Sequence, residues 1–158
     1  MVVYATLFST GMIDAIFNDK ELVFGVISGR VSTAINRKLY RAFKSNNIGL
    51  TPEQFMVLQF LTIKDGISQQ ELAKVTYRDK TSITRILDNL AKNACIARFP
   101  DKADKRSNLI HLTKNGMELH QRAKGVVLQG MQEALKGLTT EEIKFGEVIL
   151  KKIFKNIE

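Results

Sequence analysis

Residues that cross-link or interrupt a chain are scarce in this sequence. Its 158 residues include one cysteine, two prolines and no tryptophan. Because Cys95 has no second cysteine to pair with, a disulfide framework within the chain is excluded, and a reducing, cytoplasmic environment is favoured. A hydrophobic content of 44% is enough for one core at this length. We therefore expect a cytoplasmic protein whose fold needs no disulfide, metal or other cofactor.

Apolar runs long enough to cross a membrane are also lacking. The segment from Met1 to Phe17 is mostly apolar, but Asp14 interrupts it, and it is shorter than the roughly 18 residues that a membrane span needs. It has no basic start and no cleavage pattern, so we expect neither a signal peptide nor a membrane anchor. Residues 1–20 then form an N-terminal arm. Two explanations stay open: the arm packs on a partner subunit, or translation starts at Met12.

Acidic residues are outnumbered by basic ones. The 24 Lys and Arg residues against 16 Asp and Glu give a formal charge of +8 and a pI near 9.7. A protein with this balance attracts polyanions, because each cation that neutralises a phosphate releases a bound counterion. Charge alone does not distinguish DNA, RNA and a membrane surface, so the choice depends on motifs.

Patterns typical of catalysis or metal binding are missing. The sequence has no glycine-rich phosphate loop and no cluster of cysteine and histidine with metal-ligand spacing. Its two histidines, His111 in an extended segment and His120 on the inner stripe of a helix, are expected to be structural. Cys95 follows a helix and precedes a predicted hairpin, where a small buried residue is expected and an exposed redox sensor is not. We expect a protein that is not an enzyme.

Apolar residues recur at helical spacing over most of the chain. Capping patterns show where separate helices begin within this periodic stretch. The segments that start at Thr51 and Ser68 both have the form of a capping box. Gly49 is expected to take the left-handed backbone that ends the first helix. The predicted helices run from about Asp19 to Ser45, Thr51 to Ile63, Ser68 to Val75, Asp79 to Lys92, Thr113 to Gly137, and from Thr139 towards the C-terminus.

The third and fourth predicted helices are joined by a tight turn, which is typical of a helix-turn-helix. Polar and basic side chains crowd the first two turns of the fourth helix: Lys80, Thr81, Ser82, Thr84 and Arg85. A helix of this kind enters the major groove and contacts bases and phosphates with those side chains. Arg85 is predicted to bind guanine through two hydrogen bonds, and the others are predicted to make phosphate or mixed contacts.

A β-hairpin is predicted after this helix, because two extended segments, Ile96–Phe99 and Asn108–His111, flank a polar stretch. The basic residues of the hairpin tip are Lys102, Lys105 and Arg106. A basic tip beside a recognition helix suits the adjacent minor groove, into which Arg106 is predicted to insert. Asp104 is predicted to orient that guanidinium through a charge-assisted hydrogen bond.

Each of these features has a simpler explanation when it is taken alone. Polar residues at a helix start usually serve capping, and basic turns are usually solvated. A capped helix, a tight turn, a polar-fronted helix and a basic hairpin nevertheless follow one another within about forty residues, and this order predicts double-stranded DNA as the partner. The alternative is a winged-helix module for protein assembly or non-specific DNA architecture, which would show little sequence preference.

The chain resembles the MarR family of winged-helix regulators from about Leu22 to its C-terminus. The segments that carry the resemblance are Leu50 to Phe55, Ser68 to Ala73, Ser82 to Leu90, and the wing segment Asp104-Lys105-Arg106 that leads to Leu109 through Thr113. The wing segment is similar to the Asp-x-Arg pattern of the family.

The resemblance implies a mainly α fold with a small β-hairpin wing, namely a winged helix-turn-helix with terminal dimerisation helices. Residues 21–50 and 113–158 would form the dimerisation helices, and residues 51–112 the DNA-binding lobe. It also implies a homodimer on a pseudo-palindromic operator and release by a small lipophilic or phenolic effector. We expect a repressor, and an activator is the alternative that the sequence leaves open. The family commonly has glycine where this chain has Ala94. Since a left-handed alanine costs about 1 kcal/mol, Asn93 is expected to take that conformation instead.

Overall fold

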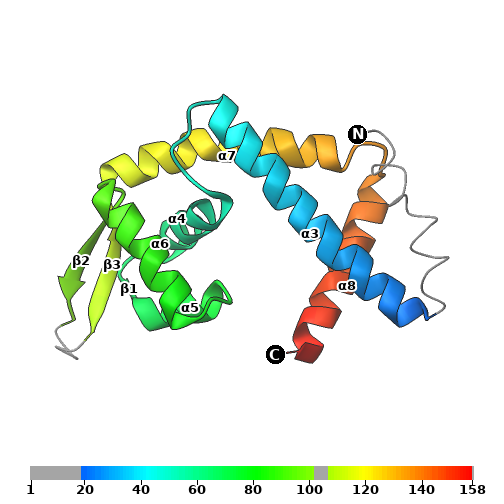
Figure 1. Ribbon diagram of the computed structural model, residues 1–158, viewed down its shortest axis with the longest axis horizontal. Helices are drawn as coiled ribbons and strands as arrows, with labels where there is room; N and C mark the ends of the chain where they lie inside the picture. Colours follow the sequence, from blue (N-terminus) through cyan, green and yellow to red (C-terminus); the bar gives the residue numbers. More distant parts are fainter. Residues whose placement is uncertain (1–18, 102–106, 158) are drawn as a thin grey trace, which may run out of the picture. The chain divides into compact units, whose positions relative to one another are not determined.

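The computed structural model describes residues 19–101 and 107–157, and most of them are helical (Figure 1). The helices and strands are α3 (Lys20–Ser45), α4 (Pro52–Ile63), β1 (Ile67–Ser68), α5 (Gln69–Val75), α6 (Lys80–Lys92), β2 (Ile96–Pro100), β3 (Asn108–Leu112), α7 (Lys114–Ala134) and α8 (Thr140–Ile157). The predicted helices and both hairpin strands are confirmed, as is the mainly α fold class. The chain divides into two compact units, Met1–Lys38 and Leu39–Glu158, and α3 passes from the first into the second.

Local capping determines where the helices begin. At α4, Gln54 N donates to Thr51 Oγ1 at 3.3 Å and Gln54 Oε1 accepts from Thr51 N at 2.8 Å, so the predicted capping box is complete. At α5, Ser68 Oγ accepts from Glu71 N at 3.2 Å, but the Glu71 carboxylate binds Lys64 Nζ at 2.5 Å. The second predicted box therefore forms only its N-cap half, because Lys64 competes for the acidic side chain.

Three helices end at a residue with left-handed backbone that is not glycine. Asn47 follows α3 with φ 53°, Tyr77 follows α5 with φ 52°, and Ala94 follows α6 with φ 51°. The expectation for Gly49 is wrong, because Asn47 takes the left-handed conformation two residues earlier. Asparagine tolerates this region better than other residues with a Cβ, so Asn47 can end the helix there.

The end of α6 shows why alanine accepts the strain at Ala94. Its N–H donates to Ala91 O, and the N–H of Cys95 donates to Leu90 O, both at 2.9 Å. These two bonds form a Schellman motif, which needs the left-handed residue at Ala94. The expectation that Asn93 would take this role is wrong, since Asn93 has φ −89°. The second bond also places Cys95, which is fully buried, in the core.

The sheet has three antiparallel strands in the order β1-β3-β2. On the central strand, Ile110 pairs with Ile67 of β1 on one side and with Arg98 of β2 on the other. The two-residue strand β1 was not predicted, because it is too short to produce an alternating pattern. It joins the start of α5 to the base of the hairpin.

The core of the second unit lies among α4, α5, α6, α7 and the sheet. Its fully buried large side chains are Phe43, Leu58, Leu61, Leu72, Ile83, Leu87, Leu90 and Ile110. Phe43 at the end of α3 meets Phe55 of α4 edge to face, with 6.1 Å between ring centroids. The buried face of α6 is therefore fixed in the core, and its opposite face is left at the surface.

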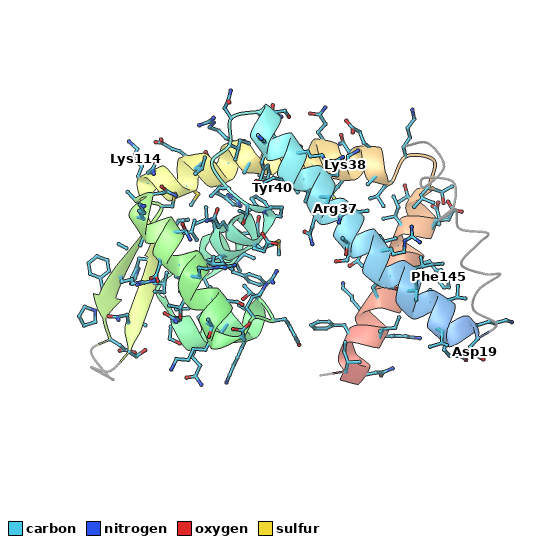
Figure 2. The ribbon with its side chains drawn as sticks, in the orientation of Figure 1. Asp19, Arg37, Lys38, Tyr40, Lys114 and Phe145 are labelled. Atoms are coloured by element: carbon cyan, nitrogen blue, oxygen red, sulfur yellow. The ribbon has the colours of Figure 1, made fainter. Side chains whose placement is uncertain are left out.

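A close backbone approach joins α7 to the segment between α6 and β2. Thr113 N donates to Cys95 O at 3.1 Å, and Thr113 Oγ1 donates to Ala94 O at 2.7 Å. Gly116 lies against the same carbonyl, so closely that an added Cβ would be 2.0 Å from Cys95 O. The first turn of α7, which contains Lys114 (Figure 2), thus fixes the position from which β2 starts.

The last helix, α8, has no buried residue within its own chain. Its start is fixed by a capping box, because Glu142 N donates to Thr139 Oγ1 at 3.2 Å and Thr139 N donates to Glu142 Oε2 at 2.7 Å. Phe145 is 68% exposed and projects from the helix (Figure 2). Within the described ranges, no helix is long and apolar enough to span a membrane.

Candidate nucleic-acid interface

The exposed face of α6 begins at a firmly capped N-terminus. Asp79 is the N-cap: its Oδ1 accepts from Ser82 N at 2.8 Å and its Oδ2 accepts from Ser82 Oγ at 2.6 Å. The hydrogen bond from the Ser82 side chain, and after it the bond from the Ser82 backbone, hold the pKa of Asp79 below its ordinary value. The Ser82 hydroxyl hydrogen is thus engaged by the cap, and the side chain is half-buried.

Thr84, one of the predicted contact residues, is also engaged within the protein. Its Oγ1 donates to Lys80 O at 2.7 Å and accepts from Gln69 Nε2 at 2.6 Å. The sequence pattern did not indicate that Gln69 and Asp79 orient the polar face of α6. A signal for Asp79 was available, since Asp is a preferred N-cap residue and Asp79 directly precedes the predicted polar face.

Three of the predicted contact residues lie at the surface of α6: Lys80, Thr81 and Arg85. Ser82 and Thr84 lie between them, but their hydroxyl hydrogens are directed at protein acceptors. The structure therefore gathers all five predicted residues on one end of α6. It leaves two cations and one hydroxyl there with open access to solvent.

A hollow of about 560 Å³ lies beside this face. The residues that line it come from the first turn of α4, the turn before α6, and α6 itself: Thr51, Glu53, Gln54, Arg78, Ser82, Arg85, Ile86 and Asn89. Arg78 precedes the N-cap of α6 and adds an exposed basic side chain that was not singled out from the sequence. The positive charge at this end of the helix is therefore larger than the five predicted residues supply.

The base of the wing is formed by β2 and β3, and an ion pair joins it to α6. Arg98 Nη2 of β2 lies 2.6 Å from Asp88 Oδ1 of α6. The predicted wing-tip residues Lys102, Asp104, Lys105 and Arg106 lie outside the described residues. Their proposed contacts stay predictions.

The other strand of the wing is bound to the turn between α4 and β1. Asp65 Oδ1 accepts from Leu112 N at 2.7 Å, and Asp65 Oδ2 lies 2.8 Å from His111 Nδ1. Partial burial raises the pKa of the Asp65 carboxyl, but the hydrogen bonds from Leu112 and His111 outweigh it and hold the pKa below its ordinary value. Gly66 has φ 69°, and the His111 ring packs where its Cβ would be.

The remaining histidine lies deep in the protein, as expected for a structural residue. His120 is 4% exposed, stacks on Phe55 with ring centroids 5.1 Å apart, and bonds Gln59 Oε1 through Nε2 at 3.0 Å. Burial, and then the nearby charge of Lys124, lower the pKa of His120. The ring is therefore neutral near pH 7 and offers no charge to a ligand.

The single cysteine is also buried, as predicted. Burial raises the pKa of the Cys95 thiol, which keeps it protonated and unreactive at neutral pH. Among the described residues, no three His, Cys, Asp or Glu side chains are grouped as metal ligands would be. Polar and basic residues of the second unit that could act together on a partner lie around α6 and the wing base.

Comparisons with known proteins agree with this geometry. The sequence pattern of the MarR family matches residues 50–107. The multiple antibiotic resistance protein MarR of Escherichia coli is 33% identical over 128 residues, which cover 79% of this chain and 89% of that protein.

Solved structures give the same result. A cysteine-to-serine mutant of Escherichia coli MarR, in complex with operator DNA, is similar with a TM-score of 0.75 and 31% identity over 82% of this chain and 91% of that chain. The PcaV transcriptional regulator of Streptomyces coelicolor, in complex with its natural ligand, shares the fold with a TM-score of 0.73 at 21% identity, over 85% of this chain and 93% of its own. With a helix-turn-helix, a wing and relatives of this identity and coverage, the chain belongs to the MarR family of transcriptional regulators.

Proposed function

We propose that this protein is a sequence-specific repressor that binds a pseudo-palindromic operator as a homodimer and has no enzymatic activity. The observation that carries the proposal is the exposed N-terminal end of α6, where Lys80, Thr81 and Arg85 lie at the surface with Arg78 beside them. A helix that buries one face and exposes cations at its N-terminal end is built to enter a major groove.

The roles of individual residues follow from their access to solvent. Arg85 is proposed to bind a guanine, because its guanidinium is exposed and can donate two parallel hydrogen bonds. Lys80 and Thr81 are proposed to contact phosphates. Ser82 and Thr84 already donate their hydroxyl hydrogens within the protein, so they would act on DNA as acceptors or by shaping the face.

The wing is proposed to bind the adjacent minor groove. Lys102, Lys105 and Arg106 would supply its charge, Arg106 would insert, and Asp104 would orient the Arg106 guanidinium. The support is the position of the wing base, which an ion pair between Arg98 and Asp88 holds directly against α6.

Dimerisation is proposed to use residues 21–50 and 113–158, with residues 51–112 as the DNA-binding lobe. The support within the second unit is α8, whose large apolar side chains are exposed: Leu138 before it and Ile143, Phe145, Val148, Leu150, Phe154 and Ile157 along it. A hollow of about 530 Å³ between the end of α7 and α8 is lined mainly by such residues. An apolar surface of this extent on a charged protein is typical of a subunit interface.

An equilibrium binding experiment tests the proposal. A duplex recovered by selection from a randomised pool is titrated with the protein at physiological salt in the presence of excess competitor DNA. We expect binding at least about a thousandfold tighter than to a scrambled duplex. Equal affinity for both duplexes would favour an architectural protein, and sedimentation that detects only monomers would exclude the dimeric arrangement.

The effector is tested with the same complex. Lipophilic and phenolic compounds are titrated into the protein bound to its selected duplex, and release of the labelled DNA is measured. A compound that releases DNA at a concentration at which it leaves the dimer intact supports ligand control. A panel without any effect on the complex would contradict the proposed release by phenolic compounds.

A further inference from the structure

The wing is fastened at its base by two carboxylates, one for each strand. Asp88 on α6 accepts from Arg98 of β2 at 2.6 Å. Asp65, in the turn between α4 and β1, accepts from the backbone N–H of Leu112 at 2.7 Å and lies 2.8 Å from His111 Nδ1. The two strands are thus held by separate groups that belong to separate elements of the lobe.

The two attachments are linked through the sheet. His111 of β3 meets Phe99 of β2 edge to face, with 5.4 Å between ring centroids. Gly66, next to Asp65, donates its N–H to Ile110 O at 3.0 Å and leaves room for the His111 ring, which an added Cβ would approach to 2.8 Å. Substitution of either carboxylate would therefore remove one of the two side-chain attachments of the wing and leave the other in place.

Neither ion pair is placed to contribute much to folding. The side chains of Asp88 and Arg98 are 56% and 33% exposed, and those of Asp65 and His111 are 49% and 36% exposed. Exposed ion pairs stabilise proteins only weakly, because water and salt screen them. They are therefore better suited to fix the orientation of the two strands than to stabilise the lobe.

A small change of angle at the wing base causes a large displacement of the residues further along the chain. From Arg98 to Asp101 the strand advances by about 10 Å, at about 3.3 Å per residue. A tilt of about 15° at Arg98 displaces Asp101 by roughly 2.6 Å, which is close to the whole length of a hydrogen bond. The angle at the wing base therefore decides whether a contact made from this strand can form.

We propose that Asp65 and Asp88 are positioning residues that fix the angle between the wing and α6, and that DNA affinity depends on this angle. The proposal rests on the proposed function, because it assumes that α6 and the wing bind one duplex together. It predicts a change in DNA affinity opposite to the change that net charge alone would cause. Loss of a carboxylate makes the lobe more positive and should strengthen DNA binding, whereas loss of the positioning contact should weaken it.

The test compares Asp65→Ala and Asp88→Ala with a matched control, Glu71→Ala. Glu71 is an acidic residue of the same lobe, and its exposed ion pair with Lys64 does not hold either strand of the wing. We expect each aspartate variant to bind the selected duplex about fivefold or more weakly, and Glu71→Ala to bind as tightly as the unchanged protein or more tightly. Alanine favours a helix more than aspartate does, so the thermal midpoint of Asp88→Ala should change little.

A second comparison separates positioning from any other role. If Asp88 acts by directing the wing, its substitution should have a clearly smaller effect in a protein that already carries Arg106→Ala, because part of the contact made by the wing is then already lost. An Asp88→Ala effect of undiminished size in that background would overturn the proposal, as would unchanged or tighter binding by Asp88→Ala alone. Should Asp65→Ala fail to fold, Asp88→Ala decides the matter by itself. Absence of specific binding by the unchanged protein would refute the proposed function instead.

Discussion

Substitution of Gly116 by alanine offers a demanding test of the packing between α7 and the start of the wing. An added Cβ would lie 2.0 Å from Cys95 O, 2.9 Å from Cys95 C and 2.9 Å from Leu112 Cδ1. The backbone oxygen cannot rotate away as a flexible side chain would. The first turn of α7 would have to withdraw by about 1.4 Å, the difference between 2.0 Å and an ordinary contact of about 3.4 Å.

That movement would disrupt the contacts that hold α7 to this segment. The bonds from Thr113 N to Cys95 O and from Thr113 Oγ1 to Ala94 O would lengthen beyond hydrogen-bond range, at about 1 kcal/mol each. Residual overpacking costs about 1–3 kcal/mol, and the better helix propensity of alanine returns about 1 kcal/mol. We expect Gly116→Ala to lower the free energy of unfolding by about 3 kcal/mol.

Urea and thermal unfolding, followed by circular dichroism at equal protein concentration, measure this change. For a chain of this size, about 3 kcal/mol corresponds to a fall in the melting temperature of roughly 6–12 °C. Gly125→Ala is the matched control, because Gly125 lies on the exposed side of the same helix and none of the described atoms would lie within 4 Å of its Cβ. We expect this variant to gain up to about 1 kcal/mol.

The two variants must therefore move in opposite directions. An equal shift of both, or a Gly116→Ala protein as stable as the unchanged one, would refute the reasoning from the close approach to Cys95.

Four further predictions concern single side chains. Ala94→Gly should raise the free energy of unfolding by up to about 1 kcal/mol, because glycine adopts φ 51° without strain; chemical denaturation measures it, and a loss of stability would contradict it. Arg85→Ala should relax the preference for one base pair in each half-site by about 1–3 kcal/mol in binding to a set of singly altered duplexes, and a uniform loss would assign Arg85 to a phosphate. Arg106→Ala should weaken operator binding while sedimentation still detects the dimer; unchanged affinity would remove the wing tip from the interface. The pKa of His120 is lowered in the folded state, so stability is highest above the unfolded pKa of about 6.5 and falls as the pH drops from there through the lowered value; urea midpoints between pH 7.5 and 5 should show this fall, and His120→Gln should reduce it.

The helices could be predicted from the sequence because their signals are local. Thr51 and Gln54 are three residues apart, and the capping box that they predict is present in full. The periodicity of α6 places Ile83 and Leu87 inward, and both are fully buried. Such patterns need only the geometry of one helix, so no knowledge of the rest of the chain is required.

The errors arise where a contact outside the local sequence pattern decides the outcome. Glu71 leaves its predicted cap because Lys64 is close by in the fold. Ala94 takes the left-handed conformation in place of Asn93 because Cys95 must enter the core and bond Leu90 O. Local propensity favours asparagine at such a position, but tertiary packing is worth more than the strain of about 1 kcal/mol.

The sequence named the residues at the polar end of α6 but did not indicate the residues that hold them in place. All five residues of the polar end of α6 were named from their types and spacing. Gln69, which bonds Thr84, lies 15 residues away in the chain, and His111 lies 46 residues from Asp65. Contacts at these separations leave no periodic signal in a single sequence, so the residues that orient the site emerge only from the three-dimensional structure.

Because Cys95 is buried, the reactivity of its thiol can be used to measure local opening of the protein. It is the single thiol in the chain, and it lies where α6 ends, β2 begins and α7 packs. A thiol reagent can modify it only when that junction opens, so the rate of modification under native conditions gives the free energy of the opening. Followed with and without DNA, this rate would report how strongly a bound duplex rigidifies the base of the wing, with no label introduced into the protein.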